Sequence, residues 1–166
     1  MIQVLGYNNP AAAAVAVRGL IQLGEASVLP LLQSLDEYNY GARAYAIRAL
    51  AAIADPRALE VLVAAAETDF APSVRRAATK GLGQIRWQAN AAVVSAQQRV
   101  LHSLVTIAHD ADWSLRYAAI AGLQALGTAA ADLVPAIVEQ CRLIQASDGD
   151  VVVQARATLA VITLSP

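Results

Sequence analysis

The chain has 166 residues, which is long enough to bury a sizeable apolar core. Hydrophobic residues make up 57% of it but aromatic residues only 5%, so the excess is alanine, leucine, isoleucine and valine, which is typical of closely packed helices. With 12 basic and 13 acidic side chains the net charge is −1, so no global field favours nucleic acid or an anionic membrane as a partner.

Cysteine usage and the N-terminal segment bear on the location of the protein. The single cysteine, Cys141, excludes an internal disulfide framework, which fits a reducing compartment. The opening MIQVLGYNNP has neither a positively charged region nor a long apolar run, unlike a secretory signal. No run of about 18 apolar residues without charge indicates a membrane span. We therefore expect a cytoplasmic protein.

A helical unit that recurs along the chain is clearest in residues 39–62, which read as a helix, an Asp-Pro corner and the start of a second helix. Residues spaced by four and three lie on one side of such a helix. The frame has an alanine, then a leucine, then a leucine or isoleucine, and occurs five times: Ala16, Leu20 and Leu23; Ala46, Leu50 and Ile53; Ala78, Leu82 and Ile85; Ala119, Leu123 and Leu126; Ala155, Leu159 and Ile162. We expect these five sets to be the packing faces of five inner helices.

Partner helices are expected between the inner ones, at residues 26–35, 57–67, 95–109 and 131–146. Two helices in each period of roughly 30 to 47 residues are typical of HEAT and armadillo repeats. The prediction is an all-α fold, a single HEAT-like α-solenoid domain over residues 1–166 with about five helical-hairpin repeats. The first repeat lacks its outer helix, so either another chain covers that end or part of the natural N-terminus is absent.

Arginines recur six residues after an acid in three of the repeats. The pairs are Glu37 and Arg43, Asp69 and Arg75, and Asp110 and Arg116. This spacing places the acid in the turn before an inner helix and the arginine in its first turns. We interpret the pairs as a structural ladder of charge-assisted hydrogen bonds that joins successive repeats.

No catalytic motif is present. The chain has no GxSxG, no glycine-rich phosphate loop and no HExxH, and Cys141 has no histidine nearby in sequence. His102 and His109 are seven residues apart, without the i, i+4 spacing and the further acids or thiols of a metal site, so a packed or surface pair is favoured. The sequence therefore predicts neither a metal centre nor a polar active site of the usual kind.

A basic stripe runs along the inner helices beside the arginine ladder. Arg18, Arg48 and Lys80 share one position of the frame, and Arg76 and Tyr117 share another, one turn earlier. If the inner helices line the concave side of the solenoid, the stripe forms a basic groove. The alternative is a solvated charged face.

Large aromatic residues gather at helix ends near these cations. They form two groups: Tyr38, Tyr40 and Tyr45, and Trp87, Trp113 and Tyr117. Aromatic rings beside cations would form a site for a planar anionic ligand. The alternative is that the rings simply fill the ends of the solenoid.

Three segments carry a resemblance to a known family: YNYGARAYAIRALAAIADPRALEVL, TDFAPSVRRAATKGLGQIRW and DADWSLRYAAIAGLQALG. They resemble the HEAT-like phycobilin lyases of the E/F type, most of all the F (beta) subunits of cyanobacterial phycocyanobilin lyases, from about Tyr7 to the C-terminus. The resemblance implies a heterodimer with a homologous E (alpha) subunit that attaches phycocyanobilin by a thioether bond to a cysteine of the phycocyanin alpha subunit. Because the acceptor thiol belongs to the substrate protein, Cys141 need not be a nucleophile.

The resemblance also implies a task for the basic stripe. The lyase would hold the open-chain tetrapyrrole as its substrate, with no permanently bound cofactor, and orient its ethylidene group toward the thiol. Cations would bind the propionates, aromatic rings would stack on the pyrroles, and Asp112 or Asp110 would accept pyrrole N–H groups, although the ladder competes for Asp110. The candidate bilin-binding residues are Arg18, Tyr38, Tyr40, Tyr45, Arg48, Arg76, Lys80, Trp87, Asp112, Trp113 and Tyr117.

Departures from the family and competing interpretations remain. The chain has no His-Cys dipeptide, which is associated with the related lyase-isomerases, so simple attachment is favoured over isomerisation. The N-terminus is short for an F subunit, as in a compact variant or a truncated chain. Alternatives are a non-catalytic HEAT adaptor, including the phycobilisome-degradation proteins that bind the same antenna, and a general protein-interaction solenoid unrelated to bilins.

Overall fold

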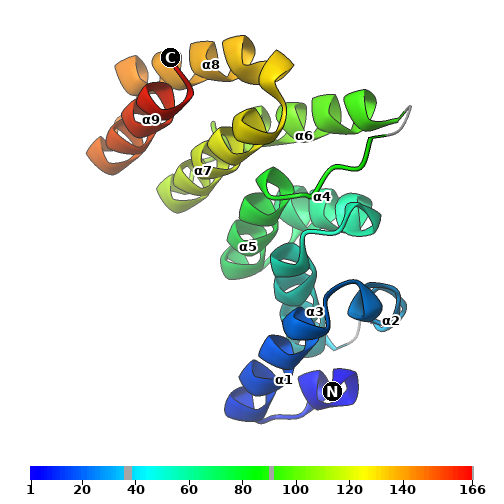
Figure 1. Ribbon diagram of the computed structural model, residues 1–166. Coiled ribbons are helices and arrows are strands. Elements are labelled where there is room, and N and C mark those ends of the chain that lie inside the picture. Colours follow the sequence, from blue (N-terminus) through cyan, green and yellow to red (C-terminus); the bar gives the residue numbers. More distant parts are fainter. Residues whose placement is uncertain (36–38, 90–91, 166) are drawn as a thin grey trace.

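The computed structural model describes residues 1–35, 39–89 and 92–165, and every regular element in these ranges is helical. The helices form two layers that curve together from one terminus to the other (Figure 1). The inner layer consists of α1 (Pro10–Leu23), α3 (Tyr40–Ile53), α5 (Pro72–Gly83), α7 (Trp113–Ala129) and α9 (Val151–Leu164). The outer layer consists of α2 (Val28–Gln33), α4 (Leu59–Thr68), α6 (Val93–Ile107) and α8 (Val134–Ser147). The predicted all-α solenoid is confirmed.

Short 3₁₀ helices precede most of the outer helices. They are η2 (Gly24–Ser27) before α2, η3 (Pro56–Ala58) before α4 and η4 (Ala131–Leu133) before α8. Three of the four predicted outer helices, α2, α4 and α8, therefore start with a 3₁₀ turn that continues into the α-helix. In the first repeat, where no outer helix was expected, the short 3₁₀ helix η1 (Ile2–Gly6) packs against α1 and α3.

Side-chain caps determine where four of the inner helices begin. The Oδ1 of Asn9 accepts the N–H of the third residue beyond it at 3.0 Å, and Asn39 does the same for α3 at 3.0 Å. Asp112 and Asp150 cap α7 and α9 by accepting the N–H two residues later, each at 2.8 Å. α5 instead starts with Pro72, which has no N–H to satisfy. The start of a helix decides which of its residues face the core.

The packing face of α9 differs from the expected one. Three residues expected to be buried are exposed: Ala155, Leu159 and Ile162. The buried face consists of Val153, Ala157 and Ala160. Because Asp150 caps α9 as Asp112 caps α7, Gln154 takes the place that Arg116 has in the preceding repeat, and the apolar frame begins two residues later than predicted. A shift of two residues rotates a helix by about 200°. The expected and the observed buried residues are equally apolar, so the sequence pattern alone predicted the wrong face.

One stretch in the described part of the chain, Pro10–Gln33, is long and apolar enough to cross a membrane by length and composition. The chain turns sharply within it, because α1 ends at Leu23 and Gly24 has a φ of 60°. The segment forms the helical hairpin of the first repeat, and α1 packs against α3. The corner also leaves Leu23, which was expected in the packing face, 57% exposed.

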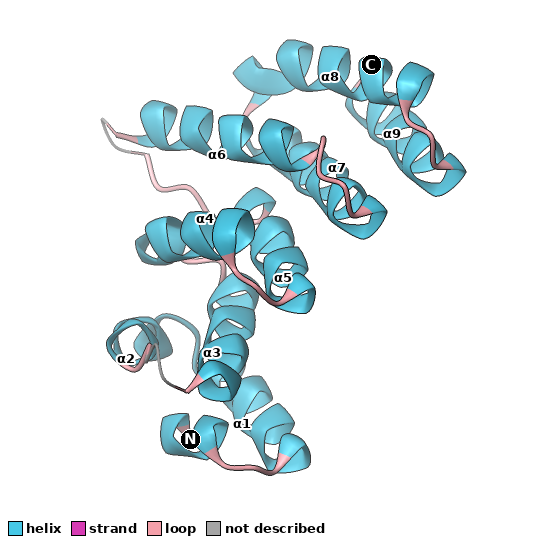
Figure 2. Cartoon of the chain, turned by 180° about the vertical axis from the view of Figure 1, so that it is seen from behind, coloured by secondary structure: helices cyan, strands magenta, loops and turns pink. Residues whose placement is uncertain are grey.

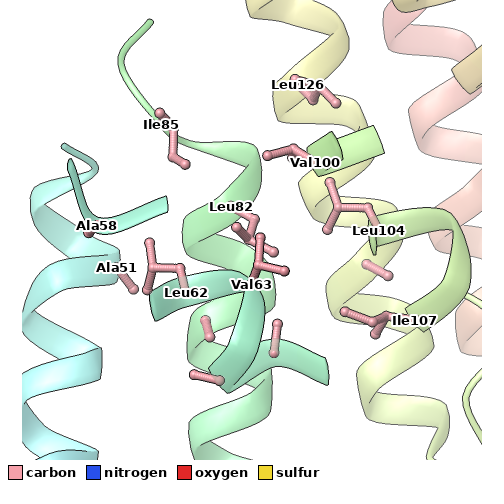
Figure 3. Packing of buried hydrophobic residues seen from close by; sticks show 14 of the residues in the cluster. Ala51, Ala58, Leu62, Val63, Leu82, Ile85, Val100, Leu104, Ile107 and Leu126 are labelled. Atoms are coloured by element: carbon pink, nitrogen blue, oxygen red, sulfur yellow. The ribbon is translucent and has the colours of Figure 1, made fainter. Parts of the chain in front are cut away.

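The core lies between the two layers and runs continuously along the solenoid. Figure 3 shows buried side chains of outer and inner helices packed together, with Leu62 of α4 beside Ala51 of α3 and Leu104 of α6 beside α7. Small residues let the inner helices approach closely: a Cβ on Gly81 would lie 2.6 Å from the Cβ of Ala51, and one on Gly83 would collide with the backbone of Gly122.

The solenoid curves because the inner helices pack more closely on one another than the outer helices do. Each inner helix packs against the next along the whole stack, whereas contacts between outer helices are sparser, and the outer helices fan apart in the view from behind (Figure 2). The inner layer therefore lies on the concave side, where the basic stripe was expected to form a groove.

Candidate functional site

Arginines of the inner helices form their ion pairs with carboxylates of the following repeat, and Arg116 also donates to the main-chain carbonyl of Asp110, the acid six residues earlier, at 3.0 Å. Arg43 Nη1 lies 2.8 Å from Asp69 Oδ2, an ion pair whose alignment falls short of a hydrogen bond. Arg75 Nη2 donates to Asp110 Oδ2 at 2.7 Å. Glu37, the expected first acid, lies outside the described residues. These contacts connect the ends of successive inner helices.

The ion pairs between successive repeats continue with Asp148, which the search for an arginine six residues after an acid did not identify. Arg116 binds it in a bidentate manner, with Nε–Oδ2 at 2.7 Å and Nη2–Oδ1 at 2.9 Å. The hydrogen bonds from Arg116 lower the pKa of Asp148, although burial opposes the shift. A glutamine, Gln154, stands six residues after Asp148, and its Nε2 donates to the Asp148 carbonyl at 2.6 Å. A search for acid–arginine pairs overlooks this repeat because its sixth residue is uncharged.

The basic stripe lies on the concave face of α3 and α5, and two of its guanidinium groups are held by serines of the next helix. Arg48 Nη2 donates to Ser73 Oγ at 3.1 Å, and the guanidinium carbon is 5.7 Å from the centroid of the Tyr45 ring. Arg76 Nη1 donates to Ser114 Oγ at 2.9 Å. The two arginines are thus oriented across adjacent helices, and Arg76 also lies within ion-pair distance of Asp112.

A hollow of about 290 Å³ opens where α5, α7 and α9 meet on this face. Its lining combines cationic, aromatic and apolar side chains: Arg76, Lys80, Trp113, Ser114, Tyr117 and Val152. Trp113 is half exposed there, which leaves its ring accessible to a ligand. The structure therefore brings together four of the predicted residues, two cations and two aromatic rings, in one hollow.

A further cation, Arg156, belongs to the same neighbourhood and was not singled out in the sequence. Its guanidinium carbon lies 5.9 Å from the centroid of the Tyr117 ring, and Nη2 donates to Gln124 Oε1 at 2.7 Å. The corrected register of α9 is what turns Arg156 toward α7. Its signal in the sequence is the Asp150 cap, which sets that register.

The two candidate acids have different surroundings. Asp112 Oδ1 accepts hydrogen bonds from Ser114 N–H at 2.8 Å and Ser114 Oγ at 2.7 Å, and its Oδ2 is 3.9 Å from Arg76 Nη1. The Ser114 hydrogen bonds lower the pKa of Asp112, and the charge of Arg76 adds to this. Burial opposes ionisation of Asp110, but hydrogen bonds from the Asp112 N–H and Arg75 lower its pKa overall. Asp112 is an ionised acceptor beside the hollow, whereas Asp110 belongs to the ladder.

Several predicted residues lie away from the hollow. Tyr40 packs edge-on against Phe70, with ring centroids 5.1 Å apart, beside the guanidinium of Arg43 at the ladder edge. Trp87 lines a separate hollow of about 550 Å³ with Ala125, Thr128 and Ala129, at the opposite end of α7 from Trp113. Arg18 is exposed on α1, and Tyr38 lies outside the described residues. The two expected aromatic groups are each divided.

The residues that most often carry metal or thiol chemistry are not assembled for it. Cys141 on α8 is fully buried, and this burial raises the pKa of its thiol to about 11, so the thiol is protonated at neutral pH. Within residues 1–35, 39–89 and 92–165, no three histidine, cysteine, aspartate or glutamate side chains are grouped to hold a metal ion. What the described residues present on the concave face is a hollow lined by cations and aromatic rings.

Comparison with known proteins agrees with the fold. A family model described as HEAT repeats matches residues 1–83 and 28–103, so the architecture is that of a HEAT-repeat α-solenoid protein. The chain is 54% identical over 162 residues to the phycocyanobilin lyase subunit beta of Nostoc sp. (strain PCC 7120). The match covers 96% of this chain and 80% of the relative. It is also 48% identical over 165 residues to the phycocyanobilin lyase subunit beta of Thermosynechococcus vestitus. That match covers 96% of this chain and 78% of the relative.

A solved structure adds a spatial match. The complex of CpcE and CpcF of phycocyanin lyase from Nostoc sp. PCC7120 contains a chain that is 55% identical and superposes with a TM-score of 0.90, covering 96% of this chain and 94% of that one. The chain belongs to the HEAT-repeat phycobilin lyase family of the E/F type, among the F, or beta, subunits.

Proposed function

We propose that the chain is one subunit of a heterodimeric phycobilin lyase. Together with a homologous E-type subunit it attaches phycocyanobilin, through a thioether bond, to a cysteine of the phycocyanin alpha subunit in the cyanobacterial cytosol, in association with phycobilisome assembly. Relatives named phycocyanobilin lyase subunit beta support this activity. The observation that carries the proposal is the concave hollow in which Arg76 and Lys80 face Trp113 and Tyr117.

The stripe suits a bilin because such a ligand carries two carboxylates on a conjugated, nearly planar body. Arg48 and Arg76 are held in orientation by Ser73 and Ser114, so little side-chain freedom is lost when each receives a carboxylate. The two arginines lie on adjacent inner helices, α3 and α5, so each could receive one of the two carboxylates. The aromatic wall of the hollow then takes a pyrrole ring.

The reaction is an addition and needs no group that leaves. The acceptor thiol adds across the ethylidene double bond of the bilin, a carbon–sulfur bond forms, and the thiol proton ends on the bilin. The task of this chain is to bind and orient the tetrapyrrole, since correct orientation of two reactants supplies a large part of such a rate enhancement. Ionised Asp112 is placed to accept pyrrole N–H groups, and buried Cys141 does not compete with the acceptor thiol. Phycocyanobilin is a substrate here, and no permanently bound cofactor takes part.

The test is co-expression of the chain with the E-type subunit, the phycocyanin alpha chain and bilin-making enzymes, read as covalent fluorescence on a denaturing gel. We expect Arg48→Ala with Arg76→Ala to lower attachment at least about a hundredfold, because each of the two lost arginine–carboxylate contacts is worth about 1.5–3 kcal/mol. The control is Arg99→Ala, which removes an exposed outer-layer arginine paired with Glu60. Unchanged attachment in the double variant would exclude the stripe as the bilin site. A wild-type chain that binds phycocyanin but transfers no bilin would instead be an adaptor.

A further inference from the structure

Arg156 carries a positive charge into the contact between α9 and α7 without a carboxylate to balance it. The arginines of the ladder each face a carboxylate of the next repeat. Arg156 instead donates to the amide oxygen of Gln124 at 2.7 Å and lies 5.9 Å from the centroid of the Tyr117 ring. Within residues 1–35, 39–89 and 92–165, no carboxylate lies within ion-pair distance of it. The charge of Arg156 therefore serves no ion pair between described residues.

The guanidinium of Arg156 also holds a hydrogen-bond donor that is not satisfied. Its Nη1 is inaccessible to solvent and has no hydrogen-bond partner in the described part of the chain. The positive charge of Arg156 opposes the rise that burial causes in the pKa of the Cys141 thiol, so the guanidinium lies close to the apolar interior of the last repeat. Burying an unpaired donor and an uncompensated cation lowers stability, and an apolar side chain of similar length would avoid both effects. The stability of the fold alone does not explain an arginine at this position.

The contacts of Arg156 converge on the wall of the concave hollow. Tyr117 and Gln124 are seven residues apart, so they lie two turns from each other on one face of α7. Tyr117 lines the hollow, and so does Val152, which lies one turn before Arg156 on α9. The hydrogen bond to Gln124 orients the guanidinium, and the guanidinium in turn lies over the Tyr117 ring. Arg156 thus supports an aromatic wall of the hollow from its border.

The same combination of contacts occurs at the other end of the basic stripe. Arg48 of α3 donates to Ser73 of α5 and lies 5.7 Å from the centroid of the Tyr45 ring. Each of these two arginines is oriented by a neutral side chain of an adjacent inner helix while it contacts a tyrosine ring. On the concave face, an arginine therefore accompanies a tyrosine twice.

We propose that Arg156 is a positioning residue of the bilin hollow, which holds the Tyr117 ring in the orientation on which a pyrrole ring stacks. The inference rests on the proposed function. Offset stacking needs a defined ring plane, and a ring that is held before binding loses little rotamer freedom when the ligand arrives. Arg156 acts through Tyr117, and its unpaired donor and uncompensated charge are retained because they keep this ring in place.

The test titrates free phycocyanobilin into the full chain mixed with the E-type subunit and follows the absorption and induced circular dichroism of the bound bilin. The variant is Arg156→Met, which keeps an unbranched stem and removes the guanidinium. The matched control is Arg142→Met, which removes an exposed arginine of α8 in the same repeat. We expect Arg156→Met to bind phycocyanobilin about fivefold or more weakly and to change the induced circular dichroism, because the stacking ring is no longer held. The control should bind like wild type.

Urea unfolding of the same proteins separates positioning from a purely structural role. Arg156→Met should unfold at a urea midpoint equal to or higher than that of wild type, because a methionine leaves no buried donor unpaired and no cation uncompensated. If Arg156→Met lowers the midpoint and Arg142→Met does not, Arg156 serves the packing of α9 on α7 and the inference is overturned.

Tyr117→Leu tests whether Arg156 acts through the ring. This variant alone should weaken phycocyanobilin binding about fivefold or more, since the stacking surface is lost. Adding Arg156→Met to it should change the affinity by less than about twofold, because the ring that Arg156 holds is already gone. A further loss of about fivefold in the double variant would show that Arg156 binds the ligand directly, and the positioning role would be wrong.

The titration also distinguishes this inference from the proposed function. If wild type binds phycocyanobilin and Arg156→Met binds it equally well with an unchanged induced spectrum, the positioning role is wrong and the lyase proposal stands. If the wild-type chain with the E-type subunit binds no phycocyanobilin, both proposals fail.

Discussion

Replacing Arg116 with methionine tests the ladder at its most completely formed rung. The substitution keeps the unbranched apolar stem and removes the guanidinium, so Asp148, whose side chain is 7% exposed, loses both bidentate hydrogen bonds. Breaking a buried pair from one side costs roughly 3–5 kcal/mol. Because the Arg116 side chain is itself 17% exposed, we take the lower end and expect a loss of about 3 kcal/mol of unfolding free energy. For a chain of this length that corresponds to a decrease of about 6–12 °C in melting temperature.

The assay is urea unfolding at pH 7 followed by far-ultraviolet circular dichroism, with Arg99→Met as the control. Arg99 and Glu60 are 54% and 72% exposed, so losing their ion pair should change stability by less than about 1 kcal/mol. Adding Asp148→Asn to Arg116→Met should recover about 1 kcal/mol or more, because the uncompensated charge is removed while the side-chain oxygen that accepts the Asp150 N–H remains. If Arg116→Met unfolds like Arg99→Met, the rung is a surface contact and the reasoning is wrong.

Two further predictions concern the scaffold. Hydrogen bonds from Arg116 lower the folded-state pKa of Asp148. The stabilisation they provide is therefore present above the unfolded pKa of about 3.9 and is lost as pH falls through the folded pKa. Urea unfolding at pH 7, 5 and 3 should show a steeper decrease in unfolding free energy for wild type than for Arg116→Met. Equal slopes for the two proteins would contradict that assignment. Gly83→Ala should lower the unfolding free energy by about 2 kcal/mol or more, because the added Cβ would meet the backbone of α7. Gly149→Ala, with open space around the added Cβ, should be nearly neutral. Similar melting temperatures for the two variants would show that the inner helices are not packed this closely.

The sequence anticipated the fold because the repeat is a local pattern. An alanine at Ala46 and leucines at Leu50 and Leu82 recur with helical spacing, and caps such as Asn39 lie within four residues of the helices they start. The same locality explains the error in α9. Two apolar sets two residues apart satisfy the helical period equally well, and only the Asp150 cap distinguishes them.

The candidate site was predicted in part. Residues on one face of one helix, such as Arg76 and Lys80, were grouped correctly because their relation is set by helix geometry alone. Trp87 was placed too close to Trp113, because the linear order says nothing of which end of a 17-residue helix a connecting loop reaches. Arg156 was missed because its approach to Tyr117 depends on the stacking of α9 on α7.

The amino-acid sequence by itself determined the helical repeats, their two-layer alternation and the resemblance to the phycobilin lyases, since all of these depend on neighbouring residues or on short segments. The tertiary structure decided the partners of the ladder arginines, which lie 32 residues apart at Arg116 and Asp148. It also decided the composition of the concave hollow and the exposure of Ile162 at the end of the stack. These features depend on how one repeat lies on the next, and that relation is set by packing between helices distant in the chain.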